Sequence, residues 1–553
     1  MSAGGKTRAW VLTLLLLAVA GVVLVWHSLR FDFVTDDAFI SFVYAKNLVE
    51  HGALVFNLDE RVEGYTNFLW TLILALGMRL GVAPELSSRG LGTLCAAVTL
   101  AVGAWILRRL RTEGERSALQ PFDALPALIL CGVPGYACWA SGGLETQLFT
   151  MLITLGSGFY LAVLGGEAPA AAEARALRGT ALCFGLAALT RPEGYLFFAL
   201  VGLHFLLRRL WPSGAAGEPE GLVRLRRLVP GRGELVALGV FLVLTVPHLL
   251  WRRWYYGYWV PNTFYIKASG GSAAFRQGAY YLFAFSRDLK LFVLPLLWAT
   301  GLLRPLPLPL HRRYLAAGGA VYLLTAVFLL YVLSVGGDFM GLYRFVLPVV
   351  PLSAVCGALG LWRLLRGQRL APVVVLGLLV AHGVNTYFVD RHALSFIGAD
   401  RGIDTPGFLR HYTADRAAIG KWLGQNVQPD DYQVVGGAGA QVYYAGIRAL
   451  DSFGLSDAYV AHSVPPVSVR PGHQKFAPLE YVLSRRPTIL TYNVYRIDSQ
   501  PYRPSPGEEA MWRARGFHYV SVQIPGLSSP WYSFLKRIDR RLGPLPPLTE
   551  QSP

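Results

Sequence analysis

Two adjacent carboxylates, Asp36 and Asp37, begin a polar stretch that extends to Trp70 and follows the first hydrophobic segment. An ionised carboxylate can accept a proton from an attacking hydroxyl group or hold a divalent metal ion, and a pair can divide these tasks. A structural role is the alternative, because Thr35 or Asp36 could cap a helix that runs through Asn47. The dipole of such a helix would lower the pKa of both acids, so we expect both to be ionised at neutral pH.

Two further polar motifs place charged residues at the ends of hydrophobic segments. Glu145 lies in SGGLET (residues 141–146), and Arg191 and Glu193 lie in TRPEG (residues 190–194). Acids at such positions are often only solvated or helix-capping, and an arginine there can contact a lipid phosphate in any membrane protein. The proline after Arg191 favours a helix start, which would hold the arginine at the boundary. Both interpretations stay open at this point.

A third group of polar residues lies further along the chain. Asn262 and Lys267 belong to YYGYWVPNTFYIK (residues 255–267), and Asp338 and Arg344 belong to GGDFMGLYR (residues 336–344). Cationic anchors are common at membrane surfaces, and Asp338 could form a structural salt bridge with Arg344. Alternatively, Arg344 neutralises a phosphate, whose geometry a planar guanidinium matches, while Asp338 holds a sugar hydroxyl.

Composition defines the class of protein that carries these motifs. Of the 553 residues, 53% are hydrophobic and 15% are charged, whereas soluble proteins are about a quarter charged. We therefore predict a polytopic membrane protein. The net charge of +17 does not indicate nucleic-acid binding, because no basic run is interleaved with stacking aromatic residues. The five cysteines all lie in apolar stretches, without the spacing of disulfides or metal ligands.

Hydrophobic segments are predicted to span the membrane wherever roughly twenty apolar residues permit a helical crossing. Eleven such spans are expected near residues 9–29, 89–107, 123–140, 146–164, 179–190, 194–207, 235–251, 279–302, 314–334, 345–362 and 371–388. The clustering of arginines in alternate loops places the N-terminus in the cytoplasm and the C-terminus outside. Residues 67–80 are too short for a span and contain Arg79, so we predict an interfacial helix here, with Tyr65, Phe68 and Trp70 at headgroup depth.

This topology predicts two domains and one site. Residues 1–388 form the membrane domain, and its first external loop, residues 30–88, carries the aspartate pair. Residues 389–553 lack a long apolar run and are predicted to form an extracytoplasmic α/β domain. Its GGAGA segment (residues 436–440) is not a dinucleotide fingerprint, so its glycines are expected to serve only a turn. All the unusual polar motifs then fall on the outer face, which favours a cavity there.

The ordered set of motifs resembles the bacterial GT-C membrane glycosyltransferases, specifically those similar to the terminal β-(1→2)-arabinofuranosyltransferases of mycobacterial cell-wall assembly. The motifs are DDAFISFVYAKNLVEHGALVFN, ERVEGYTNFLW, SGGLET, LTRPEG, YYGYWVPNTFYIK, GGDFMGLYRFVLPVVP, LDSFGLSD and GHQK, in order from residue 35 to about residue 490. The last is similar to a GHEK pattern in which Gln474 replaces the acid.

The resemblance implies a mainly α-helical, multi-pass GT-C protein of the bacterial plasma membrane, surrounded by membrane lipids. It implies transfer of a sugar, with arabinofuranose as one option, from a polyprenyl-phosphate donor to an extracytoplasmic cell-envelope glycan acceptor. Asp36 or Asp37 would be the base. We predict donor-phosphate contacts from Arg344, Lys267, Arg191, His473 and Lys475. We predict sugar or acceptor contacts from Asp338, Glu145, Glu193, Asn262, Tyr65 and Asn67.

Two other classes of function stay open. A transporter or flippase of lipid-linked glycans would share the ligand, but it should carry polar groups or broken helices at mid-membrane. A non-catalytic envelope-assembly protein could keep the same fold. No cofactor is predicted with certainty: Asp36 and Asp37 could hold a divalent metal, but no His/carboxylate spacing demands one.

Overall fold

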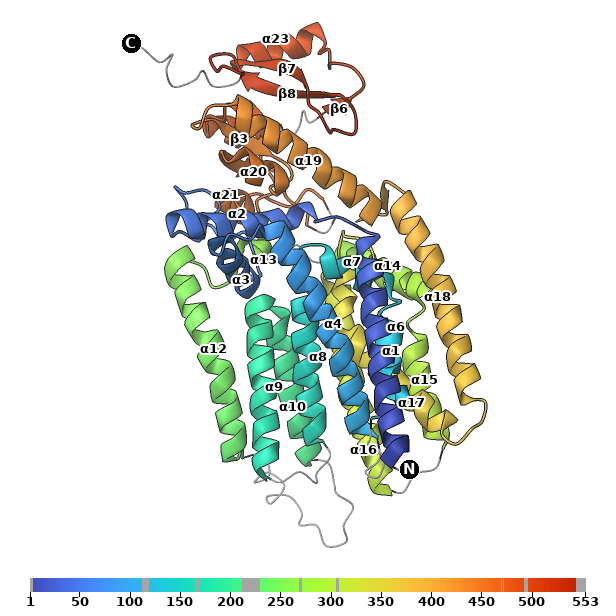
Figure 1. The fold of residues 1–553 in the computed structure, drawn as a ribbon. Helices are drawn as coiled ribbons and strands as arrows, with labels where there is room; N and C mark the ends of the chain where they lie inside the picture. The colour runs from blue at the N-terminus through green and yellow to red at the C-terminus, as the bar shows by residue number, and fades with distance from the viewer. Residues whose placement is uncertain are drawn as a thin grey trace.

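The chain folds into a helical bundle with a sheet-containing region at one end. The computed structural model describes residues 3–111, 119–164, 170–210, 229–267, 271–304, 308–468, 470, 472–491 and 496–543. The N-terminus lies at the end of the bundle far from the sheet, and helix α2 (Asp36–His51) lies across the opposite end, between the bundle and the sheet (Figure 1). The segment that contains the aspartate pair therefore forms the junction between the two parts.

Helices form most of the first 395 residues. In chain order, after α1 (Ala3–Leu29) and α2, they are α3 (Phe68–Arg79), α4 (Pro84–Leu110), η1 (Pro121–Ala124), α6 (Leu125–Leu130), α7 (Pro134–Ser141), α8 (Thr146–Val163), α9 (Ala170–Thr190), α10 (Glu193–Leu210), α12 (Arg232–Tyr256), α13 (Asn262–Lys267), α14 (Ser272–Leu289), α15 (Val293–Thr300), η2 (Gly301–Leu303), α16 (Leu308–Ser334), η3 (Arg344–Val349), α17 (Val350–Leu365) and α18 (Ala371–Ser395).

The predicted multi-pass membrane character is confirmed. Six of the described helical segments, in α1, α4, α12, α16, η3 with α17, and α18, are long and apolar enough to cross a membrane. The bent pair formed by residues 121–130 and 134–141 would be a seventh span. The total of eleven crossings stays a prediction. The single predicted span at 279–302 is wrong, because α14 ends at Leu289 and α15 begins only at Val293, with Lys290 in a left-handed conformation between them.

In the bent pair of residues 121–130 and 134–141, three backbone carbonyl groups near the break form hydrogen bonds with side chains of neighbouring helices. The two segments meet at an angle of 72°, and Pro134, which has no N–H to donate, starts α7. Side chains of α1 and α18 contact the carbonyls freed at the break: His27 Nδ1 to Cys131 at 2.9 Å, His382 Nε2 to Ile129 at 3.0 Å, and Thr386 Oγ1 to Gly132 at 2.5 Å. A break inside a membrane bundle is tolerated when neighbours provide such partners.

The C-terminal region contains a six-stranded sheet, as expected for an α/β unit. After the short antiparallel pair β1 (Ala399–Asp400) and β2 (Ile403–Asp404), its strands are β3 (Tyr432–Val435), β4 (Arg448–Asp451), β5 (Ile489–Leu490), β6 (Arg496–Asp498), β7 (Phe517–Gln523) and β8 (Trp531–Arg537). The strand order is β4-β3-β5-β8-β6, with β7 also on β8. Strands β4, β3 and β5 are parallel, and β8 is antiparallel to β5, β6 and β7.

Helices join this sheet to the bundle and cover it. They are α19 (Pro406–Asn426), α20 (Ala440–Ala445), α21 (Ala458–Ser463), α22 (Leu479–Ser484) and α23 (Pro506–Ala514). Helix α18 continues through residue 388 to Ser395, and α19 then connects the bundle to the sheet (Figure 1). Ile419 and Leu423 of α19 pack with Ile489 and Phe534 of the sheet. This packing holds the β3–α20 turn above the start of α2.

Candidate functional site

A cavity of about 340 Å³ lies where the start of α2 meets the C-terminal region, within the usual range of ligand pockets, about 300–1,000 Å³. Its walls come from the start of α2, from Phe339 after α16, and from the C-terminal region around residues 404–416, 436–438, 451–455 and 470–473. The lining brings together three of the residues predicted from the sequence, Asp36, Asp37 and His473. His473 is more than 430 positions from the aspartate pair in the chain. Because the fold brings these residues together, this cavity is the candidate site.

Asp36 attaches helix α2 to the C-terminal region. Its carboxylate is 6% exposed and accepts the backbone N–H of Ala440, with Oδ1 2.8 Å from the nitrogen. Burial raises the pKa of Asp36, and the Arg416 charge and the N–H groups of Ala440 and Gly439 only partly oppose this. The expected lowering of its pKa by the helix dipole is therefore wrong, because desolvation outweighs the dipole in this buried position.

Two glycines permit this close contact between α2 and the β3–α20 turn. A Cβ atom at Gly439 would lie 1.9 Å from the carbonyl oxygen of Asp36, and one at Gly437 would lie 2.3 Å from the Tyr412 hydroxyl. The expectation that the GGAGA glycines serve only a turn is therefore wrong. They let the backbone of the C-terminal region approach α2, and this approach allows Asp36 to reach the N-terminus of α20.

Asp37 has different surroundings from its neighbour. It is half-buried, lines the cavity, and lies in the first turn of α2. The free N–H groups of a helix N-terminus favour a negative charge at such a position. Asp36 is thus buried, whereas Asp37 keeps part of its side chain accessible at the cavity wall.

Sequence reasoning missed two further carboxylates in the cavity. Asp451 ends β4 and accepts the backbone N–H groups of Phe453 at 3.0 Å and Ser456 at 2.9 Å. Asp404 ends β2 and forms an ion pair with Arg470 at 2.7 Å. Burial raises the pKa of each of these aspartates to about 6. Asp451 lies in the LDSFGLSD motif, which was a signal, whereas Asp404 has no local motif around it.

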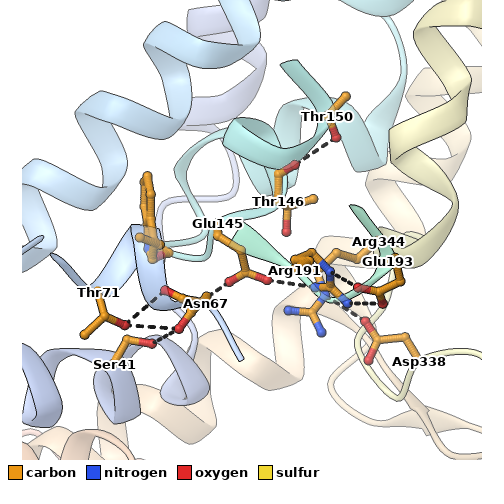
Figure 2. A network of polar contacts seen from close by, with 12 residues as sticks. Ser41, Asn67, Thr71, Glu145, Thr146, Thr150, Arg191, Glu193, Asp338 and Arg344 are labelled. Atoms are coloured by element: carbon orange, nitrogen blue, oxygen red, sulfur yellow. Dashed lines mark hydrogen bonds and ion pairs between the residues drawn. The ribbon is translucent and has the colours of Figure 1, made fainter. Parts of the chain in front are cut away.

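A second polar cluster connects α2 to the bundle, and Figure 2 shows its side chains pointing toward one another. Arg191 forms ion pairs with Glu145 at 2.7 Å and Glu193 at 3.0 Å. Asn67 donates to Glu145 at 2.9 Å and accepts from Ser41 of α2 at 3.1 Å. Burial opposes ionisation of Glu145, but the charges of Arg191 and Arg344 hold its pKa below its usual range. The cluster is buried, internally paired and absent from the cavity lining.

Asp338 and Arg344 form the salt bridge that the sequence analysis gave as the structural alternative. Arg344 Nε lies 2.8 Å from Asp338 Oδ2, and both side chains are buried. The guanidinium also lies 5.4 Å from the ring centre of Trp139 and 5.3 Å from that of Phe345. Neither residue lines the cavity, although Phe339, next to Asp338, does. Contacts of this pair with a phosphate or a sugar stay predictions.

The remaining predicted residues lie away from the cavity lining. Tyr65 is 3% exposed and its hydroxyl lies 3.2 Å from that of Tyr256, and Trp70 is also buried. Both therefore pack in the protein core, and their depth relative to the membrane stays a prediction. Asn262 lies 3.2 Å from a ring nitrogen of His462.

Neither of the two predicted lysines is among the described residues that line the cavity. Lys475 is buried and donates to the Ala461 carbonyl at 2.6 Å, and burial lowers its pKa. Lys267 ends α13, but its side chain lies outside the described residues. In the part of the chain that the structure describes, no three His, Cys, Asp or Glu side chains are grouped so that they could hold a metal ion.

Comparison with known proteins gives one family model and several relatives. A domain of unknown function (DUF8728) matches residues 408–535. Two proteins named terminal β-(1→2)-arabinofuranosyltransferase are similar to this chain. The one from Mycobacterium tuberculosis is 29% identical over 60% of this chain and 53% of its own length. The one from Corynebacterium glutamicum is 30% identical over 64% of this chain and 52% of its own length. The chain thus spans about half the length of these relatives.

The fold is similar to that of ArnT from Cupriavidus metallidurans. The apo structure of ArnT matches 96% of this chain and 98% of its own, with a TM-score of 0.59 and 14% identity. ArnT bound to undecaprenyl phosphate matches 81% and 86%, with a TM-score of 0.53 and 16% identity. The expected GT-C fold and the resemblance to arabinofuranosyltransferases are confirmed.

Proposed function

We propose that this chain, whose fold is of the GT-C type, is a membrane glycosyltransferase that uses a polyprenyl-phosphate sugar donor. The proposal is supported by the names of the two relatives and by the lipid phosphate bound in one ArnT structure. The sugar is arabinofuranose, as in the relatives' names, and the acceptor is a hydroxyl of a cell-envelope glycan. The observation that carries the proposal is the cavity that joins the aspartate pair to the C-terminal region.

In the proposed reaction, the bond between the anomeric carbon and the donor phosphate breaks, and its electron pair leaves with the phosphate. A new bond forms between the acceptor oxygen and the anomeric carbon, and the hydroxyl proton passes to a carboxylate. Asp37 is the base, because its carboxyl is partly accessible at the cavity wall. Asp36 holds α2 against the β3–α20 turn through the N–H of Ala440. Fixed cations near the departing phosphate stabilise the transition state.

The end of the bundle that carries the sheet faces the extracytoplasmic side in this proposal, and the N-terminus lies in the cytoplasm. A polyprenyl donor would then reach the cavity from the bilayer, while the soluble acceptor glycan would approach from outside. A periplasmic reporter fused after residue 543 should be active, and a cytoplasmic reporter at the same place should be inactive. The reverse result would overturn the proposed sidedness and with it the donor class.

The decisive experiment is a transfer assay with purified protein in nanodiscs. A polyprenyl-phosphate arabinofuranose should donate its sugar to an arabinan acceptor, whereas a nucleotide-linked sugar should not. An Asp36→Asn, Asp37→Asn double variant serves as the inactive control, with its rates referred to the folded fraction of the protein. Transfer from the nucleotide sugar alone, or full activity of the double variant, would refute the proposal.

A further inference from the structure

Two arginines line the candidate cavity among the described residues, and their surroundings differ. Arg416 is 4% exposed, and its Nη1 donates to the Gln441 side chain at 2.8 Å. Its positive charge favours the ionised form of Asp36 and partly opposes the effect of burial on the pKa of that residue. Arg470 has a side chain that is 38% exposed, and it is the first residue of the segment RPGHQK (residues 470–475). Arg470 is therefore the guanidinium in the lining that a ligand can reach.

The guanidinium of Arg470 is held on one edge and lacks a partner on another nitrogen. Its Nη2 donates to Asp404 at 2.7 Å. Its Nε is buried and has no hydrogen-bond partner among the described residues. Asp404 thus occupies only part of the hydrogen-bonding capacity of the guanidinium, and the side chain is 38% exposed, so a ligand can supply further acceptor atoms. Phosphate oxygens are well suited to such a role, because a planar guanidinium matches them with parallel hydrogen bonds.

Arg470 and two residues that follow it, Gly472 and His473, pack against Phe339, which follows α16. The Arg470 guanidinium lies 5.9 Å from the ring centre of Phe339. The His473 ring packs edge-to-face on the same Phe339 ring, with 4.9 Å between the two ring centres. Gly472 has φ +76°, and a Cβ at this position would lie 3.2 Å from the Phe339 ring. Gly472 thus packs directly on the Phe339 ring, and both its positive φ and this close approach favour a glycine.

Asp404 is attached to the same residue from the other side. Its backbone N–H donates to the Phe339 carbonyl at 2.6 Å, and its carboxylate is 4% exposed. The ion pair is therefore held against Phe339 on both sides, through the backbone N–H of Asp404 and through the ring contact of the Arg470 guanidinium. A cation with so little freedom loses little entropy when it binds an anion.

The cations predicted from the sequence have other partners. Arg191 is shared by two glutamates, Arg344 is paired with Asp338, and the Lys475 ammonium donates to a backbone carbonyl. None of these three lines the cavity. Recruiting Arg191 or Arg344 for a phosphate would leave buried carboxylates without a counter-charge, which is strongly unfavourable.

We propose that Arg470 contacts the phosphate of the lipid-linked donor and that Asp404 is its positioning residue. This inference rests on the proposed function and assigns its phosphate subsite to the C-terminal region. The Asp404 carboxylate occupies Nη2, and the phosphate accepts from N–H groups on the exposed part of the guanidinium. The same contact would hold the isoprenyl phosphate that is left after transfer.

The test measures donor and product separately in Arg470→Gln, Arg470→Lys and Asp404→Asn proteins. Arg470→Gln should raise the KM for the donor and the inhibition constant of isoprenyl phosphate at least tenfold, and leave the KM for the acceptor unchanged. Arg470→Lys should restore part of the loss, because it keeps the charge without the fork geometry. Asp404→Asn should have a smaller effect, and none when added to Arg470→Gln.

Arg448→Gln is the matched control, because Arg448 pairs with Asp59 at 2.6 Å in the same region and does not line the cavity. It should leave every constant unchanged. Unaltered donor KM and isoprenyl phosphate inhibition in Arg470→Gln would overturn the inference while the proposed function stands. If the unaltered protein transfers no sugar, native mass spectrometry with undecaprenyl phosphate provides the second readout. Equal binding by both proteins, or binding by neither, would then overturn the phosphate contact.

Discussion

Substituting Asp36 and Asp37 one at a time should separate a structural role from a catalytic one, because the two carboxyls have different surroundings. In Asp36→Asn, the amide keeps one acceptor oxygen but presents N–H groups to a site that holds the N–H donors of Gly439 and Ala440. Leaving one buried donor without a partner costs about 1–3 kcal/mol. We therefore expect Asp36→Asn to lower the stability of the junction by this amount. Asp37 is half-buried, so Asp37→Asn should change stability by less than about 1 kcal/mol.

Activity should show the opposite order. Loss of a general base typically costs about 10²–10⁴-fold in rate, so Asp37→Asn should lose at least a hundredfold in kcat with a normal unfolding temperature. Asp36→Asn should lose activity in step with its lowered stability. Gly439→Ala should behave in the same way, because its Cβ would lie 1.9 Å from the Asp36 carbonyl oxygen.

The assay pairs initial rates of sugar transfer with thermal unfolding of the same nanodisc preparations, so that rates refer to folded protein. Gly507→Ala is a matched control, because a Cβ there would meet no atom of another part of the chain within 4 Å and Gly507 does not line the cavity. Near-normal transfer by Asp37→Asn would refute the assignment of the base. A stable Asp36→Asn protein that has lost more activity than Asp37→Asn would show that the two roles are reversed.

Three further outcomes are expected. Arg191→Gln leaves the buried Glu145 and Glu193 without their cation and should destabilise the protein by about 3–5 kcal/mol, measured by thermal unfolding; an unchanged melting temperature would contradict the paired network. Asp451→Asn should flatten the pH dependence of unfolding. The pKa of Asp451 is about 6 in the fold against an ordinary 3.8, so its protonation contributes stability below pH 4 that is lost as the pH rises past 6, about 3 kcal/mol; parallel pH curves for the two proteins would contradict this. Asp390→Leu should weaken the attachment of α18 to α1, since Asp390 lies 2.9 Å from His27, and a lower unfolding temperature in the same nanodisc preparations is the readout.

The sequence predicted the architecture well, because the signals for it are local. Long apolar segments identify membrane helices, and the loss of such segments after α18 identifies a separate α/β region. The breaks were less predictable. Arg287, Asp288 and Lys290 lie between two apolar stretches. The chain turns there, and α14 meets the C-terminal region through Gln277 and Tyr280 at residues 400–401.

The candidate site was predictable only in part. The motifs identified Asp36 and Asp37 and correctly grouped Glu145, Arg191 and Glu193, since residues at the same end of a bundle meet. They did not indicate that these charges neutralise one another instead of lining the cavity. That outcome depends on side-chain distances of about 3 Å, which no spacing along the chain encodes. Asp404 was missed for the same reason, because its partners Arg470 and Phe339 are each more than 60 positions away.

The division of the cavity wall between residues 35–40 and residues 404–473 sets an order for biosynthesis. A ribosome makes α2 early, but the surfaces that enclose its carboxylates emerge only after α18 has been inserted into the membrane. The growing polypeptide would therefore have no enclosed reaction chamber during translation. Under the proposed function, catalytic competence would arise in one late docking event, when the C-terminal region closes over the loop that preceded it by several hundred residues.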